Sequence, residues 1–284
     1  MADTHEAPPE RLWHYTSGSA ARSIFQNKAL WAGHLGYMND SSEVNLAMNL
    51  SRPIVGEFSS EFPHLKEAFD RWSNYVLDRP PGSWAPNTFA VSFSEERDLL
   101  SQWRGYATGP GGPFSIGFPT STLMDRLNAG SLTWSLRRCL YDRTDQEALI
   151  RSQVRTMLLH LSDKTNEAPE TYPWRTPWEA IRSAVMSVAP LCKDHGFREE
   201  REWRLVAGPL KPEQHQPVHF VDRRHTMAPY IEFPLADDEP LGNIQWIAGP
   251  GPEQARANSA LGLVARIAGI PDYVGHNSEI PYLP

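Results

Sequence analysis

The stretch FREEREWRLV (197–206) carries three Glu and three Arg in ten positions and ends in apolar residues. Successive side chains of a β-strand point to opposite faces of the sheet. A strand over this stretch places Glu200, Glu202, Arg204 and Val206 on one face, and Arg201, Trp203 and Leu205 on the other. Neither face is purely polar, so we predict an inner strand with two carboxylates and a guanidinium in a row on one side.

The composition favours one loop-rich α+β domain. The chain has 284 residues, 40% of them hydrophobic, with 25 Pro spread along it and no internal repeat. Its formal charge of -7 argues against non-specific binding to nucleic acid or to a membrane surface. Two cysteines suit buried free thiols in a reducing cytoplasm. We predict a disordered tail over 1–10, a single domain over 11–284, and a cytoplasmic protein without a membrane segment.

Apolar periodicity and capping residues predict the secondary structure. Asp40 and Glu43 have capping-box spacing, and Pro53 should end the helix that they begin. Ser94 should cap a helix whose apolar stripe includes Leu100. Further helices are expected over 19–33, 60–77, 145–161, 177–191 and 253–267. Strands are expected over 12–15, 88–93, 114–118, 197–206, 218–221, 230–233 and 244–248, and near 273.

Several short groups of residues are typical of ligand sites as well as of ordinary structure. A His and hydroxyls at a strand end can hold a ligand, and a helix N-terminus beside hydroxyls suits a phosphate or ribose. An Arg can pair with phosphate. The candidates are His14, Tyr15 and Thr16; Asn39, Asp40 and Glu43; Ser92, Phe93 and Ser94; and Arg104.

The acidic stretch adds Glu200, Glu202 and Arg204 to the candidates. A carboxylate pair beside an Arg can do acid–base work, stabilise a cation or bind a divalent metal. A nuclease of the restriction type would need a Lys shortly after the acid pair, where this chain has Trp203 and Arg204. The chain contains no GxGxxG, P-loop, GxSxG or HExxH motif, which argues against a Rossmann oxidoreductase, a P-loop kinase and an α/β-hydrolase.

Taken in order, five segments resemble a widespread bacterial family of unassigned function. They are LWHYTS, LWAGHLGYMNDSSE, FAVSFSEERDLLSQWRGYA, GFREEREWRLV and IAGP with SEIPY, and they span about 12–282. The order of the motifs is also similar to that of the ADP-ribosyltransferases. In that superfamily a His or Arg on a first strand, a Ser-x-Ser element on a second and a Glu on a later strand form the site. His14, the element at 92–94 and Glu200-x-Glu202 resemble these three motifs.

The resemblance implies an α+β fold with a split β-sheet core and surrounding helices, and NAD as substrate. A carboxylate, assigned to Glu202, would stabilise the ribose as nicotinamide leaves, and Glu200 would orient or deprotonate the acceptor. His14 would hold the ribose, Arg104 would meet the pyrophosphate, and Arg204 would keep Glu202 ionised. Tyr15 or another aromatic residue would stack on nicotinamide. Further cofactor contacts are assigned to Thr16, Ser92, Phe93 and Ser94, and substrate contacts to Asn39, Asp40, Glu43 and Arg204.

The acceptor stays open between a protein and a nucleic acid, as expected for a toxin or defence effector with an antitoxin or immunity partner. Three alternatives also stay open. One is an NAD glycohydrolase, and another is a non-catalytic module that binds a nucleotide or a protein. The third is a metal-dependent phosphodiesterase using His14, Asp40, Glu200 and Glu202, whereas the transferase itself requires no metal.

Overall fold

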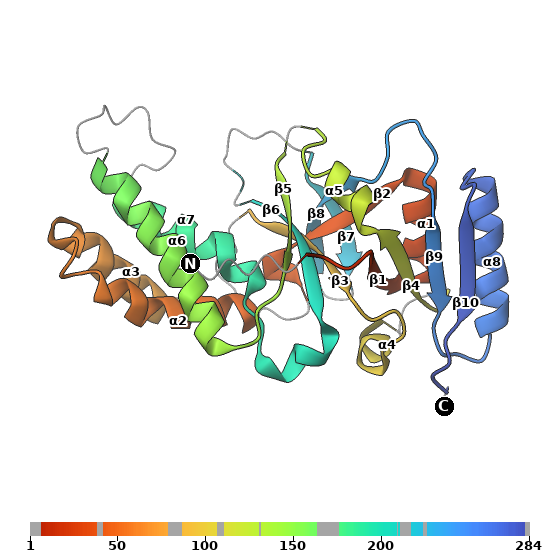
Figure 1. Cartoon of the computed structure of the whole chain (residues 1–284), viewed down its shortest axis with the longest axis horizontal. Coiled ribbons are helices and arrows are strands. Elements are labelled where there is room, and N and C mark those ends of the chain that lie inside the picture. Colours follow the sequence, from red (N-terminus) through yellow and green to blue (C-terminus); the bar gives the residue numbers. More distant parts are fainter. Residues whose placement is uncertain are drawn as a thin grey trace.

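The computed structural model describes residues 7–38, 42–78, 87–106, 111–130, 132–163, 176–208, 210, 217–223 and 226–281. They form an α+β fold built on a large mixed sheet (Figure 1). One group of helices packs against one face of this sheet and a second group packs against the other face. In the described ranges, the strands are β1 (Arg11–Ser17), β2 (Ala29–His34), β3 (Phe89–Ser94), β4 (Pro113–Pro119), β5 (Trp134–Arg138), β6 (Glu202–Ala207), β7 (His219–Arg223), β8 (Thr226–Pro234), β9 (Ile244–Ala248) and β10 (Tyr273–Asn277). The α-helices are α1 (Gly18–Asn27), α2 (Ser42–Glu57), α3 (Lys66–Asp78), α4 (Leu100–Tyr106), α5 (Thr120–Asp125), α6 (Arg143–Asp163), α7 (Pro177–Val188) and α8 (Gln254–Ile267).

The sheet divides at β3. Strand β6 pairs along the whole of β3, from Phe89 to Ser94, and so occupies one of its two edges. The other edge is shared: β2 pairs with Phe89 and Ala90, and β1 pairs with Ser94. The main path therefore runs β10-β9-β4-β1-β3-β2-β8-β7, with β6 and β5 branching from β3. Between these two contacts β1 and β2 diverge, and the middle of β3 faces the gap.

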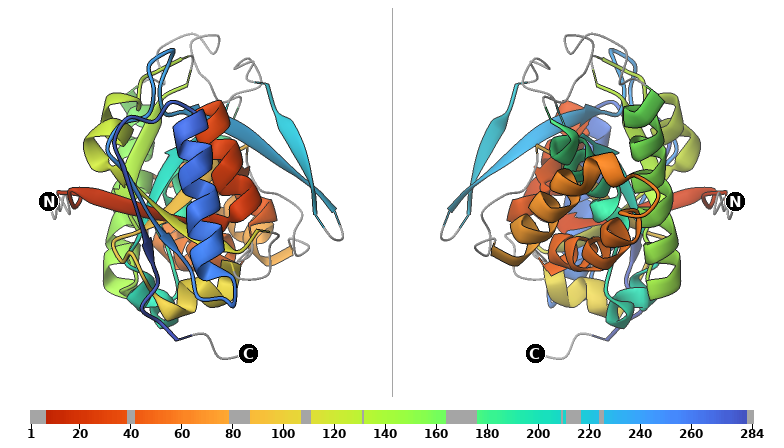
Figure 2. Two further views of the ribbon diagram at one scale, coloured as in Figure 1. Left: turned by 90° about the vertical axis from the view of Figure 1, so that its right-hand side faces the viewer. Right: turned by 90° about the vertical axis from the view of Figure 1, so that its left-hand side faces the viewer.

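Two hydrophobic cores hold the sheet. On one face, Trp203 and Leu205 of β6 pack in a core that includes α1, α5 and α8. On the other face, Ala90 and Val206 pack in a core that includes α2, α3, α6 and α7, the helices grouped at the left of Figure 1. Figure 2 shows α1 and α8 side by side and the β7–β8 hairpin extending away from the rest of the molecule.

Strand β6 confirms part of the prediction for the acidic stretch and corrects the rest. Glu202, Arg204 and Val206 do share one face, and Trp203 and Leu205 share the other. The strand begins only at Glu202, because Arg201 has a left-handed backbone with φ 42° that ends a 3-10 helix, η5 (His195–Glu200). Glu200 therefore lies on η5 and not on the strand.

Tertiary packing also overrides three helix predictions. Helix α1 ends at Asn27 because Lys28 adopts φ 51°. The residues that follow were predicted as part of this helix, but they form strand β2 and pair with β8. Helix α2 continues through Pro53 to Glu57, since Ile54 and Phe58 extend its buried stripe. Burying one such apolar side chain stabilises the fold by about 1.5–3 kcal/mol, whereas a proline inside a helix costs about 3 kcal/mol.

Helix α4 begins at Leu100, so Ser94 does not cap it. Instead the Ser94 hydroxyl accepts a hydrogen bond from the Glu96 N–H at 3.0 Å in the turn before the helix. Leu100 is 44% exposed and does not belong to the predicted stripe, whereas Trp103 is buried. At the N-terminus, part of the predicted tail contacts the domain: the Thr120 N–H donates to the Glu10 carbonyl at 2.9 Å, and its hydroxyl donates to the Pro9 carbonyl.

Candidate functional site

A hollow of about 220 Å³ opens where β1 and β2 diverge from β3. We call it the β1–β2 hollow. Its walls come from β1, α1, β2, β3, β7 and β8, so segments from both ends of the chain form it. The polar and aromatic residues that line it are His14, Thr16, Ser23, Trp31, Ser92 and Tyr230. Of the predicted site residues, His14, Thr16 and Ser92 thus meet in one place.

His14 is held in a defined state. Its Nδ1 lies 2.9 Å from the Ser92 carbonyl oxygen. A carbonyl oxygen can only accept, so Nδ1 carries the hydrogen. Burial lowers the pKa of His14, although this hydrogen bond opposes the shift, and the neutral ring leaves Nε2 as an acceptor. A neutral imidazole with one free acceptor suits a ligand hydroxyl.

Glycine and aromatic residues form the opposite wall. Gly33 of β2 lines the hollow, and a Cβ added to it would meet nothing within 4 Å. Across the ladder Gly33 pairs with Tyr230, whose ring stacks on Trp31 with 4.3 Å between the centroids and 25° between the planes. Trp31 is 38% exposed. This wall offers planar rings to a ligand beside a polar wall formed by His14 and Ser92.

Four predicted cofactor contacts lie outside the hollow. The Tyr15 ring packs edge-on against Trp103, with its hydroxyl donating to the Glu96 carbonyl at 2.8 Å and accepting from the Leu99 N–H at 2.9 Å. Tyr15 therefore points to the face of β1 opposite His14 and lies outside the lining of the hollow, so the structure gives no support to its predicted stacking on nicotinamide. Phe93 is a core residue against Phe118.

Ser94 also serves the framework instead of the hollow. Its hydroxyl donates to the Glu200 carbonyl at 2.6 Å and so ties β3 to the end of η5. Arg104 is exposed on α4 and lies outside the lining of the hollow, so the structure gives no support to its predicted pyrophosphate contact. Asn39 and Asp40 lie outside the described residues.

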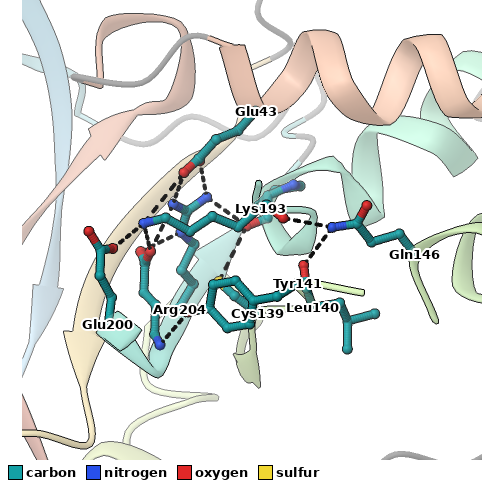
Figure 3. A network of polar contacts seen from close by, with 10 residues as sticks. Glu43, Cys139, Leu140, Tyr141, Gln146, Lys193, Glu200 and Arg204 are labelled. Carbon is teal, nitrogen blue, oxygen red and sulfur yellow. Dashed lines mark hydrogen bonds and ion pairs between the residues drawn. The ribbon is translucent and has the colours of Figure 1, made fainter. Parts of the chain in front are cut away.

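The remaining candidates form a buried ion cluster, shown in Figure 3. It consists of Glu43 of α2, Lys193, Glu200 of η5, and Glu202 and Arg204 of β6. The side chains of these residues are between 3% and 16% exposed. Three carboxylates and two cations leave one negative charge in excess when all are ionised.

Arg204 binds two carboxylates at once. Its Nε donates to Glu202 Oε1 at 2.7 Å, and its terminal nitrogens lie 2.9 Å and 2.6 Å from the two oxygens of Glu43. It also donates to the Pro190 carbonyl at 2.7 Å. Lys193 donates to both Glu200 and Glu202. These contacts occupy both oxygens of Glu202.

The charges of the cluster follow from these contacts. Burial alone would raise the pKa of Glu202, but Arg204 and Lys193 outweigh it and hold that pKa at about 2. Burial would likewise lower the pKa of Lys193, and the facing carboxylates, Glu202 first, raise it instead. Both groups are thus charged at neutral pH. Glu200 differs, because its pKa is raised by burial in spite of Lys193.

Further hydrogen bonds hold β6, which carries Glu202 and Arg204, and the segment that carries Lys193 in place. The Tyr141 hydroxyl accepts from the Glu202 N–H at 2.7 Å. The Gln146 amide donates to the carbonyls of Leu140 and Lys193, at 2.7 Å and 2.8 Å, so that the segment after α7 is joined to the segment after β5 (Figure 3). These bonds keep Lys193 directed at the carboxylates.

The hollow and the cluster are neighbours across β3. Ser92 lines the hollow and is also the ladder partner of Arg204, while Ser94 is the partner of Glu202. Glu200 and Glu202 themselves lie outside the lining of the hollow. The expected direct approach of Glu202 to a ligand beside His14 is therefore not seen, because the carboxylate turns toward α2 and Lys193. Of the four residues expected for the phosphodiesterase, His14 therefore lines the hollow without Glu200 and Glu202, and Asp40 lies outside the described residues.

The sequence reasoning missed three of the residues that define these sites. Trp31 and Gly33 were expected in a helix, and Lys193 stands in a loop segment without a motif. The usable signal for the first two was ALWAGH (29–34), a short apolar run followed by a Gly, because a Gly in a strand often marks a place where a ligand or another backbone approaches closely. Lys193 gives no local signal, since its role comes only from the three carboxylates that the fold brings to it.

Within the described part of the chain, no group of three or more His, Cys, Asp or Glu is arranged to hold a metal ion. The carboxylates of the ion cluster surround protein cations instead. None of the described helices combines the length and the apolar character needed to cross a membrane.

Comparison with known proteins adds one finding. Residues 102–205 match a family model described as "Protein of unknown function (DUF2971)". This agrees with the resemblance to a family of unassigned function, over a shorter stretch than the motifs spanned. The matched segment contains Lys193, Glu200, Glu202 and Arg204 of the ion cluster, whereas His14 and Ser92 precede it. No curated protein and no solved structure matches the chain.

Proposed function

We propose that the protein binds NAD in the β1–β2 hollow and transfers its ADP-ribose part to a macromolecule, with release of nicotinamide. One observation carries the proposal. The hollow lies at the split of the sheet, where His14 on β1 and Ser92 on β3 form one wall, and β6 with Glu202 is the next strand. The motifs that resemble those of the transferases are thus on adjacent strands beside one cavity.

The polar wall suits the ribose of the ligand. The neutral His14 ring presents Nε2 as an acceptor for a ribose hydroxyl, and Ser92, whose carbonyl holds the ring, lines the hollow beside it. The indole of Trp31, on the facing wall, offers a surface for the nicotinamide ring. Because His14 is neutral, it adds no positive charge next to the cationic nicotinamide.

The ion cluster contributes charge. Breaking the bond between nicotinamide and ribose leaves an oxocarbenium-like sugar, as in glycoside hydrolysis, and nearby negative charge stabilises it. The cluster lies on the strand next to β3, where Glu202 is the ladder partner of Ser94 and Arg204 that of Ser92. Glu202 acts from that position, and a direct contact with the ribose requires it to release one of its ion-pair partners. Transfer to water instead of a macromolecule would give the glycohydrolase reaction at the same site.

A second candidate is a non-catalytic module that binds a nucleotide. The observation that favours it is the engagement of Glu202, whose oxygens are both taken by Arg204 and Lys193. Such a module keeps the hollow and its ring wall but performs no bond cleavage. Both candidates place the protein in the cytoplasm, where nucleotides are available.

Release of nicotinamide from NAD, measured in the presence of a cell lysate and with label on the adenine, separates the candidates. The transferase releases nicotinamide and moves the label to macromolecules, and Glu202→Gln abolishes both. The matched control is Glu199→Gln, which removes an exposed carboxylate of η5 and should keep full activity. Full activity of Glu202→Gln with unchanged thermal unfolding would contradict the role of Glu202. Binding of NAD without any release would favour the module.

A further inference from the structure

Three aromatic rings stack in a row across β2, β8 and β7. Trp31 stacks on Tyr230 at 4.3 Å and 25°, and Tyr230 stacks on His219 at 5.3 Å and 29°. The strands set this order, because Tyr230 pairs with Gly33 on one side and with His219 on the other. We call these three side chains the ring stack.

The ring stack lies at the surface and not in a core. Trp31 is 38% exposed, His219 is exposed, and neither belongs to a hydrophobic core of the described residues. Gly33, the ladder partner of Tyr230, leaves open space beside the rings, because a Cβ there would meet nothing within 4 Å. Tyr230 lies between the other two rings, so the ring faces left open to a nucleobase are those of Trp31 and His219.

The ring stack and the hollow are continuous. Trp31 and Tyr230 line the hollow, and His219 extends the row of rings beyond its lining. At about 220 Å³ the hollow is smaller than the 300–1,000 Å³ typical of sites for drug-sized ligands. It therefore accommodates about one nucleoside unit, and the other half of a dinucleotide must lie outside it. The part of the ring stack that continues along β8 and β7 from the lining is Tyr230 with His219.

We propose that the outer end of the ring stack, His219 supported by Tyr230, is the subsite for the adenine ring of the dinucleotide, with nicotinamide against Trp31 and its ribose in the hollow against His14 and Ser92. This inference rests on the proposed function. In this arrangement the adenine half and the nicotinamide half of the ligand contact different residues. Each half can therefore be tested with its own mononucleotide.

Calorimetry with AMP and, separately, with nicotinamide mononucleotide tests the assignment. Tyr230→Leu removes the middle ring, and Tyr230→Phe is its matched control because it keeps a ring of the same size. His219→Ala removes the outer ring without touching the lining of the hollow. We expect AMP affinity to fall roughly tenfold or more in Tyr230→Leu and severalfold in His219→Ala, and to stay within twofold in Tyr230→Phe. The affinity of His219→Ala for nicotinamide mononucleotide should stay unchanged.

Two results would overturn the subsite. If NAD and nicotinamide mononucleotide bind but AMP binds equally to all variants, the ring stack does not take the adenine, and the proposed function stands without it. If His219→Ala weakens nicotinamide mononucleotide as much as AMP, the two halves are not separated as we infer. Absence of binding by NAD and both mononucleotides would instead defeat the proposed function itself. Unchanged thermal unfolding of each variant shows that the fold is kept.

Discussion

Replacing Arg204 by Met tests the physical account of the ion cluster. The substitution keeps a flexible, unbranched apolar stem but removes the guanidinium that binds Glu43, Glu202 and the Pro190 carbonyl. Three buried carboxylates then surround the single ammonium of Lys193. Removing one partner of a buried ion pair typically costs about 3–5 kcal/mol, because it leaves charge in the interior without compensation.

For a protein of this size, such a loss should lower the melting temperature by roughly 6–20 °C. Urea unfolding followed by circular dichroism measures the free energy directly. The control is Arg143→Met, which breaks an exposed pair with Glu147, one turn along α6, and should cost only about 0.3–0.5 kcal/mol. The two variants thus make the same chemical change at a buried site, Arg204, and at an exposed site, Arg143.

The substitution Glu200→Gln tests the cluster from the other side, because it removes a carboxylate instead of a cation. Burial raises the pKa of Glu200, so folding makes its ionised form less favourable than it is in the unfolded chain. The substitution leaves two carboxylates and two cations, and we expect a change in stability below about 1 kcal/mol in either direction. The account would be refuted if Arg204→Met cost less than about 1 kcal/mol, or if Glu200→Gln cost as much as Arg204→Met.

Two further predictions concern β1. Because burial lowers the pKa of His14 below its ordinary value of 6.5, the unfolded chain binds the proton first, and stability contributed by the neutral ring is lost as pH falls through 6.5. Urea unfolding at pH 7.5 and pH 5.0 should therefore show a smaller loss for His14→Asn than for the wild type, and equal losses would contradict this. Tyr15→Phe leaves the Leu99 N–H without its acceptor and should cost about 1–3 kcal/mol without changing NAD affinity. A change in affinity with unchanged stability would show that Tyr15 contacts the ligand.

Local patterns predicted most of the elements, and the failures have identifiable causes. Strand β9 was predicted with the bounds that it has, because 244–248 is a short apolar run between turn residues. Strand β2 was missed because its residues continue the spacing of α1, and only the left-handed backbone at Lys28 and the pairing with β8 separate them. Pro53 misled the prediction of α2, since packing of the last turn outweighs the missing hydrogen bond.

The candidate site shows the same division between local and long-range information. His14, Ser92 and the acidic face of β6 could be selected from the sequence because their strands have clear patterns. Their meeting place could not, since the hollow exists only because β1 and β2 share one edge of β3. Direct contact of Glu202 with the ligand was predicted from motif order, and the approach of Lys193 from a loop directs that carboxylate elsewhere.

Calorimetry of NAD with the wild type and with Gly33→Leu tests the central claim, that the β1–β2 hollow is the NAD site. A side chain at position 33 enters the hollow, and because a Cβ there meets no neighbour within 4 Å, the variant should fold with nearly unchanged stability. We predict that NAD binds the wild type and that its affinity for Gly33→Leu falls by at least tenfold. Equal binding by the two proteins, with the variant folded, would place the ligand elsewhere and contradict the account.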